Sequence, residues 1–178
     1  MFVDSFFCAF FVSDDPDESA INEIAEVYTD SEYVISEVLQ FVFNQNFFKE
    51  SMFKKVKSPP ELVSGTAIVA GRYTTPYEYG LTDMSKKTTI MGQELLNPPT
   101  VEGWHAGREW IDSSYLVERI NFASEMIGNV ESPGVAEMID RITQNKDEIS
   151  PGELLDACLY EMGCIYLKEL SRSIIFEE

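Results

Sequence analysis

The sequence predicts an all-α protein: an irregular bundle of about six or seven helices with one long loop rich in Trp, Gly and Pro. Most segments carry apolar side chains at intervals of three and four residues, the spacing that places them on one face of a helix. Serine stands directly before proline at Ser58 and Ser150, a pattern typical of helix starts. With 178 residues the chain can bury one sizeable core. We therefore expect a single helical domain over residues 1–178.

The N-terminal segment is apolar and is followed by an amphipathic stretch. Residues 6–12 predict a short buried helix or strand. They do not resemble a secretory signal, because no Lys or Arg precedes them and aspartates follow them in place of a cleavage site. An apolar stripe over residues 20–28 then predicts a helix, with Asp17 or Pro16 in the capping positions.

Two further helices are expected before the middle of the chain. The apolar stripe over residues 34–43 predicts a helix with Ser31 as its N-cap. Phenylalanines and four lysines alternate loosely over residues 46–57, which we interpret as core aromatics covered by lysine stems rather than as a nucleic-acid surface. The Ser-Pro-Pro-Glu start at residues 58–61 predicts a helix that Gly71 ends.

The second half predicts a loop and four helices. Residues 72–83 contain Pro, Gly and three tyrosines and predict a loop, and a helix should follow over residues 84–96 until the Asn-Pro-Pro stop. Helices are also expected over residues 113–127 and 133–143. The last helix should start in a capping box at Ser150 and bury a long apolar face that reaches Leu170.

Charge and motif content exclude several classes of function. The chain has 31 acidic and 13 basic side chains, so its net charge of -18 argues against binding the phosphates of a nucleic acid. No apolar run reaches the roughly 18 residues of a membrane-spanning helix. Glycine-rich nucleotide motifs are missing, and we predict no cofactor. Three cysteines without close pairing, Cys8, Cys158 and Cys164, predict free thiols and no metal site.

One segment, residues 97–112, concentrates unusual residues. It holds both tryptophans and the single histidine, together with two glycines and two prolines. Exposing two indoles to water would forfeit several kcal/mol of burial. The tryptophans therefore either anchor the segment to the helices or line a groove.

The same region carries a family resemblance. The string GQELLNPPTVEGW over residues 92–104, followed by Gly107, Trp110 and RINFA from Arg119, resembles the large bacterial family called domain of unknown function 1800. The KVKSPPELV element at residues 55–63 also resembles the family pattern. The resemblance implies that the chain is the C-terminal portion of longer proteins. It also hints at an envelope setting, whereas the chain itself leaves a cytoplasmic or envelope location open.

Three functional hypotheses follow. The first is a non-catalytic helical module in which Trp104 and Trp110 pack into the bundle and Arg119 bonds loop carbonyls or Glu102. The second is a hydrolase of envelope or polysaccharide material. Its candidate catalytic or metal-binding groups are Glu102, His105 and Glu109. The family pattern does not demand a histidine at position 105, which argues against catalysis by this side chain.

The third hypothesis is a binding surface for a partner protein or a glycan. Aromatic side chains stack on sugar rings and on protein surfaces, and a neighbouring arginine suits either ligand. The candidate binding residues are Trp104, Arg108, Trp110 and Arg119, with Tyr77 and Tyr79 as further stacking groups. Buried indoles would argue against this hypothesis, and the oligomeric state stays open.

Overall fold

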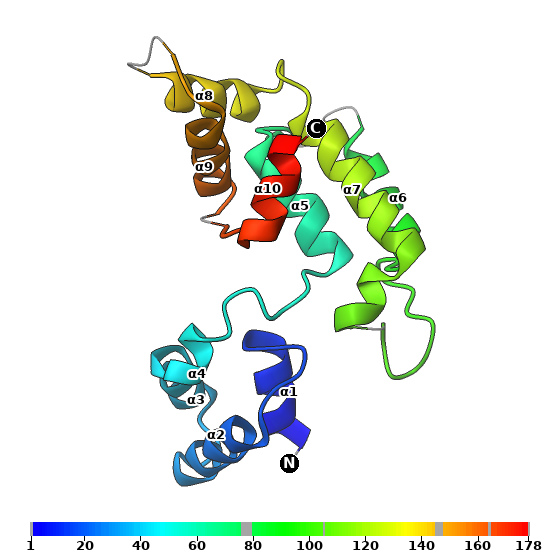
Figure 1. The fold of residues 1–178 in the computed structure, drawn as a ribbon. Helices are drawn as coiled ribbons and strands as arrows, with labels where there is room; N and C mark the ends of the chain where they lie inside the picture. Colours follow the sequence, from blue (N-terminus) through cyan, green and yellow to red (C-terminus); the bar gives the residue numbers. More distant parts are fainter. Residues whose placement is uncertain (1, 76–79, 105, 145–147, 164, 178) are drawn as a thin grey trace. The chain divides into compact units, whose positions relative to one another are not determined.

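The computed structural model describes residues 2–75, 80–104, 106–144, 148–163 and 165–177. These residues form ten α-helices and one 3-10 helix, η1, and they contain no β-strand beyond a single bridge between Thr100 and Gly103 (Figure 1). The predicted all-α class is confirmed. The described helices outnumber the expected six or seven, because the apolar N-terminus is helical, a short helix follows residue 45 and the last expected helix is divided.

The chain divides into two compact units. Unit 1 comprises residues 1–62 and 85–119, and unit 2 comprises residues 63–84 and 120–178. The boundaries fall within α5 (Pro59–Val69), α6 (Leu81–Ile90) and α7 (Ser113–Ile127). A single domain over the whole chain stays a prediction.

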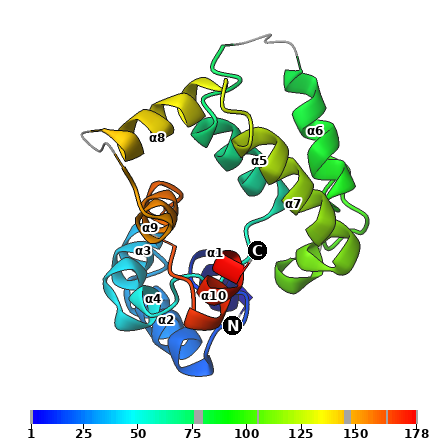
Figure 2. The same cartoon turned by 45° about the horizontal axis from the view of Figure 1, so that its top comes forward.

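The core of unit 1 is built by its first four helices. These are α1 (Phe2–Phe11), α2 (Glu18–Asp30), α3 (Ile35–Asn44) and α4 (Asn46–Lys49), which group together in both ribbon views (Figures 1 and 2). Their fully buried side chains are Cys8, Ile24, Val38 and Val42. The apolar N-terminal run is thus a helix that packs its Phe7 and Cys8 side into this core. Burial, together with Asp17, raises the pKa of the free Cys8 thiol.

Of the two N-caps predicted for α2 and α3, the first is confirmed and the second is wrong. Asp17 is the N-cap of α2 and accepts a hydrogen bond from the Ser19 backbone N–H at 2.9 Å, as predicted. Ser31 is not the N-cap of α3 but the C-cap of α2. The turn between the helices places Glu32 and Tyr33 at positive φ, so that α3 starts only after Val34. Ser31 belongs to α2 because its backbone N–H and its hydroxyl both donate back to carbonyls of the last turn of that helix.

Two boundaries around the middle of the chain shift from their expected positions. α6 begins at Leu81, inside the expected loop, and ends at Ile90 rather than Leu96. Gly92 has a φ of +95°, and the backbone N–H of Gln93 bonds back to the Thr88 carbonyl, so the helix closes there. Leu96, the last residue of the expected helix, is consequently 96% exposed.

Unit 2 contains the end of α5, most of α7, and α8 (Pro133–Thr143), α9 (Pro151–Glu161) and α10 (Glu169–Glu177). The bounds of α8 match the prediction. Its buried side chains are Val135, Met138 and Ile142, and α7 contributes Phe122 and Met126. The start of α8 touches the end of α5, where the Gly134 N–H donates to the Ala70 carbonyl at 3.1 Å.

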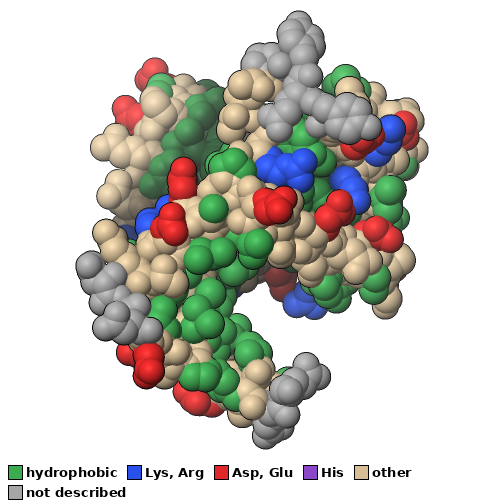
Figure 3. All heavy atoms as spheres, turned by 90° about the horizontal axis from the view of Figure 1, so that it is seen from above, with side chains coloured by type: hydrophobic (Ala, Val, Ile, Leu, Met, Phe, Trp, Pro, Cys, Tyr) green, Lys and Arg blue, Asp and Glu red, His purple; other side chains and the backbone are tan. Residues whose placement is uncertain are grey.

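The last expected helix is divided in the structure. The capping box of Ser150 and Glu153 is present, as predicted. The helix ends at Glu161 because Gly163 adopts a φ of +112°, and α10 begins only at Glu169. The long buried face is also wrong: α9 has no buried residue, and Leu170 is 74% exposed. Figure 3 shows hydrophobic side chains lying open on one face of the molecule among scattered acidic ones.

The start of α5 supports a prediction about acid stability. The Glu61 carboxylate accepts from the Ser58 N–H at 2.7 Å, and the Ser58 hydroxyl accepts from the Glu61 N–H at 3.4 Å. Partial burial opposes ionisation, yet the bonds from Ser58 and the charges of Lys55 and Lys57 hold the pKa of Glu61 below its ordinary value of 4.5. A lowered folded-state pKa means that the carboxylate stabilises the fold above about pH 4.5 and loses this effect as pH falls through the folded pKa.

We therefore expect Glu61→Gln to lower the free energy of unfolding by about 1 kcal/mol at pH 7 and by less at pH 3. Urea denaturation at the two pH values measures the difference. Glu23→Gln, on an exposed position of α2, serves as the control and should cost little at either pH. An equal cost of Glu61→Gln at both pH values would show that the charge contributes nothing.

Candidate functional site

The segment over residues 97–112 is held at its first half by Trp104. The half-buried indole donates from Nε1 to the Glu94 carbonyl at 2.9 Å. Asn97, which lies between Glu94 and Trp104 in the sequence, donates from its side-chain amide to the Glu94 carboxylate at 2.8 Å. A short turn over residues 100–103 is closed by the Gly103 N–H, which bonds to the Thr100 carbonyl at 3.1 Å. Trp104 therefore pins the segment to the chain that leaves α6.

The second half of the segment begins at a junction around Asp14. A Cβ added at Gly107, the first residue of η1 (Gly107–Ile111), would lie 3.1 Å from Cβ and Cγ of Asp14. The Asp14 carboxylate also accepts from the Val56 N–H at 2.6 Å and pairs with Lys55 Nζ at 3.7 Å. Lys55 Nζ donates further to the Ala9 carbonyl at 3.1 Å. We call the set of Asp14, Lys55, Val56 and Gly107 the Asp14 junction.

Arg119 bonds to the link between α4 and α5, the segment that also contains Lys55 and Val56 of the Asp14 junction. Its side chain is only 8% exposed, and Nη2 donates to the Lys57 carbonyl at 2.6 Å, across 62 residues of sequence. Burial lowers the pKa of the guanidinium, while Nη1 is buried without a hydrogen-bond partner among the described residues. Arg119 thus bonds to the link before α5, and not to Glu102 or to a carbonyl of residues 97–112 as expected, within the part of the chain that the structure describes.

The far end of the segment opens on a pocket in unit 1. Its volume is about 490 Å³, and it is lined by Gly92, Arg108, Glu109, Trp110, Asp112 and Tyr115. Trp110 is 9% exposed, and its Nε1 is buried without a partner among the described groups. The Tyr115 ring lies directly against Gly92, where a Cβ would come within 2.9 Å of Cζ. Asp112 stands directly before α7: its Oδ1 accepts from the Ser113 N–H at 2.6 Å, and its backbone carbonyl accepts from the Leu116 N–H at 2.8 Å.

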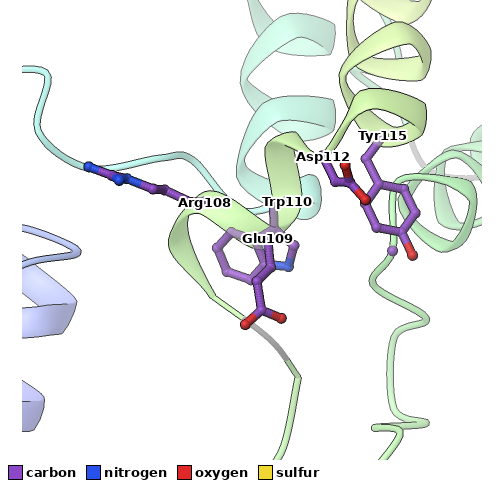
Figure 4. A pocket seen from close by; sticks show the side chains of 6 residues that line it. Arg108, Glu109, Trp110, Asp112 and Tyr115 are labelled. Carbon is purple, nitrogen blue, oxygen red and sulfur yellow. The ribbon is translucent and has the colours of Figure 1, made fainter.

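Figure 4 shows how these side chains lie. The nitrogen edge of Trp110 is turned to the side on which Asp112 and Tyr115 stand, and the Glu109 carboxylate projects beyond the indole. Arg108 extends to the opposite side of the backbone. The pocket is thus lined by two aromatic rings, two carboxylates and one guanidinium, and its three charged side chains are exposed.

The structure brings together only some of the predicted site residues. Arg108, Glu109 and Trp110 share the pocket, whereas Trp104, Glu102 and Arg119 are not among its lining residues. Glu102 is exposed in the turn over residues 100–103. The candidates His105, Tyr77, Tyr79 and Cys164 lie outside the described residues. Within the described part of the chain, no three His, Cys, Asp or Glu side chains are grouped so as to hold a metal ion.

Sequence reasoning missed Asp112 and Tyr115 as pocket residues and the whole Asp14 junction. Both residues stand at the start of the helix predicted over residues 113–127, and nothing in their local sequence indicates a pocket. The KVKSPPELV element and Gly107 were the two sequence features that could have pointed to the Asp14 junction. The sequence does not show that either lies close to Asp14 in space. Unit 2 has a second pocket of about 490 Å³ at Gly71 and Gly134, which contains none of the predicted site residues.

The described residues thus form an all-helical protein in which residues 97–112 are held by Trp104 at one end and by η1 at the other. The chain belongs to the family described as protein of unknown function (DUF1800), whose model matches residues 1–169. The resemblance found in the sequence is therefore confirmed. No curated protein and no protein of solved structure matches the chain. Of the helices in the described ranges, none is long and apolar enough to cross a membrane.

Proposed function

We propose that this protein is a non-catalytic helical module that acts as a structural and interaction element, with residues 97–112 as a tie within unit 1. The Asp14 junction is the observation that carries the proposal. There, a carboxylate in the turn after α1 bonds to the link before α5 and lies against the first residue of η1. A side chain that bonds to segments far apart in the sequence in this way stabilises the tertiary structure.

The remaining expected site residues support the same interpretation. Trp104 and Arg119 each donate to a backbone carbonyl of unit 1, and Trp110 is buried. A carboxylate pair acting on a glycosidic bond must face one scissile bond from two sides. Of the two glutamates, only Glu109 lines the pocket, and Glu102 is exposed elsewhere on the segment.

The test is hydrolysis. Wild-type protein should release no reducing ends from peptidoglycan or from neutral polysaccharides, measured over hours at high protein concentration. The double variant Glu102→Gln/Glu109→Gln should keep the helical circular dichroism spectrum of the wild type, because both side chains are exposed and glutamine has the same size as glutamate. Release of reducing ends by the wild type that the double variant loses would overturn the proposal.

A further inference from the structure

We propose that the turn after α4 attaches unit 1 to the surface of a lipid bilayer that carries anionic headgroups. The turn comprises residues 51–54 and is closed by the Lys54 N–H, which donates to the Ser51 carbonyl at 3.0 Å. We call it the 51–54 turn. The inference goes beyond the proposed function, because no residue of the segment 97–112 takes part in it.

The two central residues of the 51–54 turn are apolar and exposed. Met52 is 64% exposed and Phe53 is 61% exposed. Phe53 also adopts a φ of +64°, which glycine or asparagine fits better than an aromatic residue at the third position of a turn. Neither burial nor backbone preference accounts for a phenylalanine here. Such a conflict between a residue and its local environment is typical of functional positions.

Lysines stand on both sides of these apolar residues. Residues 46–57 contain four lysines and one glutamate, a local charge of +3 in a chain of net charge -18. Lys49 and Lys54 are exposed, and within the described part of the chain their ammonium groups form no hydrogen bond or ion pair. Salt screens charges over about 8 Å at physiological ionic strength, so a surface that touches the turn interacts mainly with these lysines. Their charge is complementary to anionic headgroups.

The 51–54 turn is fixed to unit 1 on both sides. The Ser51 hydroxyl donates to the Phe47 carbonyl at 2.6 Å, and Phe47 and Phe48 pack against the core of unit 1. The expectation that the phenylalanines of residues 46–57 belong to the core is therefore correct for these two and wrong for Phe53. On the other side, Lys55 joins the turn to the Asp14 junction. The exposed apolar side chains thus stand on a well-anchored support.

The shape of this contact favours a bilayer over a folded protein. Two apolar side chains at the vertex of a turn form a projection, which needs a matching pocket on a folded partner. A stable protein interface uses about 20–30 residues from each side, far more than one turn provides. A bilayer requires no matching shape, because apolar groups enter the boundary between headgroups and acyl chains while lysines stay near the phosphates.

Sedimentation of the full chain with lipid vesicles tests the proposal. We expect binding to vesicles of equal parts phosphatidylglycerol and phosphatidylcholine, and much weaker binding to phosphatidylcholine alone. Lys49→Gln/Lys54→Gln should bind the anionic vesicles about 25-fold more weakly, since each lysine near an anionic surface contributes about fivefold. Unchanged binding of this variant would overturn the proposal, and so would equal or no binding of the wild type to the two kinds of vesicle. Binding to soluble poly-L-glutamate without binding to vesicles would assign the turn to an acidic protein and overturn the lipid partner.

Phe53→Asn and Leu96→Asn form a matched pair of variants. Leu96 has the same φ of +64° and is 96% exposed, but no lysine stands within five residues of it in the sequence. Both variants should be at least as stable as the wild type, because asparagine tolerates a positive φ. Phe53→Asn should bind the anionic vesicles about tenfold more weakly, since an aromatic side chain no longer leaves water, and Leu96→Asn should bind as the wild type does. Equal weakening by both variants, or by neither, would overturn the role of the 51–54 turn.

Discussion

Replacing Trp110 by alanine is expected to lower the free energy of unfolding by about 3–5 kcal/mol. The side chain is 9% exposed and lies in η1, whose first residue rests on Asp14. Truncation removes the largest apolar surface of the segment and leaves a cavity that the short 3-10 helix cannot fill. Urea denaturation followed by far-ultraviolet circular dichroism measures the loss.

Trp104→Ala is the control for this result. The Trp104 indole is only half-buried and makes one hydrogen bond to the Glu94 carbonyl, so we expect a cost of about 2 kcal/mol. The difference between the two variants tests whether residues 97–112 are anchored mainly through η1. If Trp104→Ala proved as costly as Trp110→Ala, the anchor would lie in the first half of the segment instead.

The parts of the fold that could be predicted are those set by neighbouring residues. Asp17 at the start of α2 and Ser150 with Glu153 at the start of α9 form bonds across two or three residues, which their spacing already implies. Pro133 likewise begins α8 where the prediction places it. Ser31 misleads because a serine after a helix can bond backwards as well as forwards.

The parts that could not be predicted depend on distant segments. The Arg119 bond to the Lys57 carbonyl and the Asp14 bond to Val56 span 62 and 42 residues, and no local pattern specifies them. The apolar residues after Cys158 have helical spacing, yet Gly163 ends α9 before the stripe is complete. In the candidate site, composition drew attention to residues 97–112, but only the tertiary structure separates the pocket residue Trp110 from the tie residue Trp104.

The largest effect in unit 2 is expected from Gly134→Ala. A Cβ at this position would lie 2.2 Å from the Val69 carbonyl oxygen, 2.7 Å from the Gly71 nitrogen and 2.8 Å from the Ala70 carbonyl carbon. All three are backbone atoms, so no side-chain rotation can make room. The start of α8 would have to move away from the end of α5 and lose the bond from the Gly134 N–H to the Ala70 carbonyl. We expect a cost of about 4 kcal/mol or more in the free energy of unfolding.

Gly65→Ala provides the control within α5 itself. Outside the helix's own backbone, none of the described residues comes within 4 Å of a Cβ added here, and alanine favours a helix interior by about 1 kcal/mol over glycine, so this change should stabilise the protein. Opposite signs for the same chemical change would assign the cost of Gly134→Ala to the contact between α5 and α8 rather than to glycine flexibility. A Gly134→Ala protein as stable as the wild type in urea denaturation would mean that the two backbones do not approach as closely as the structure places them.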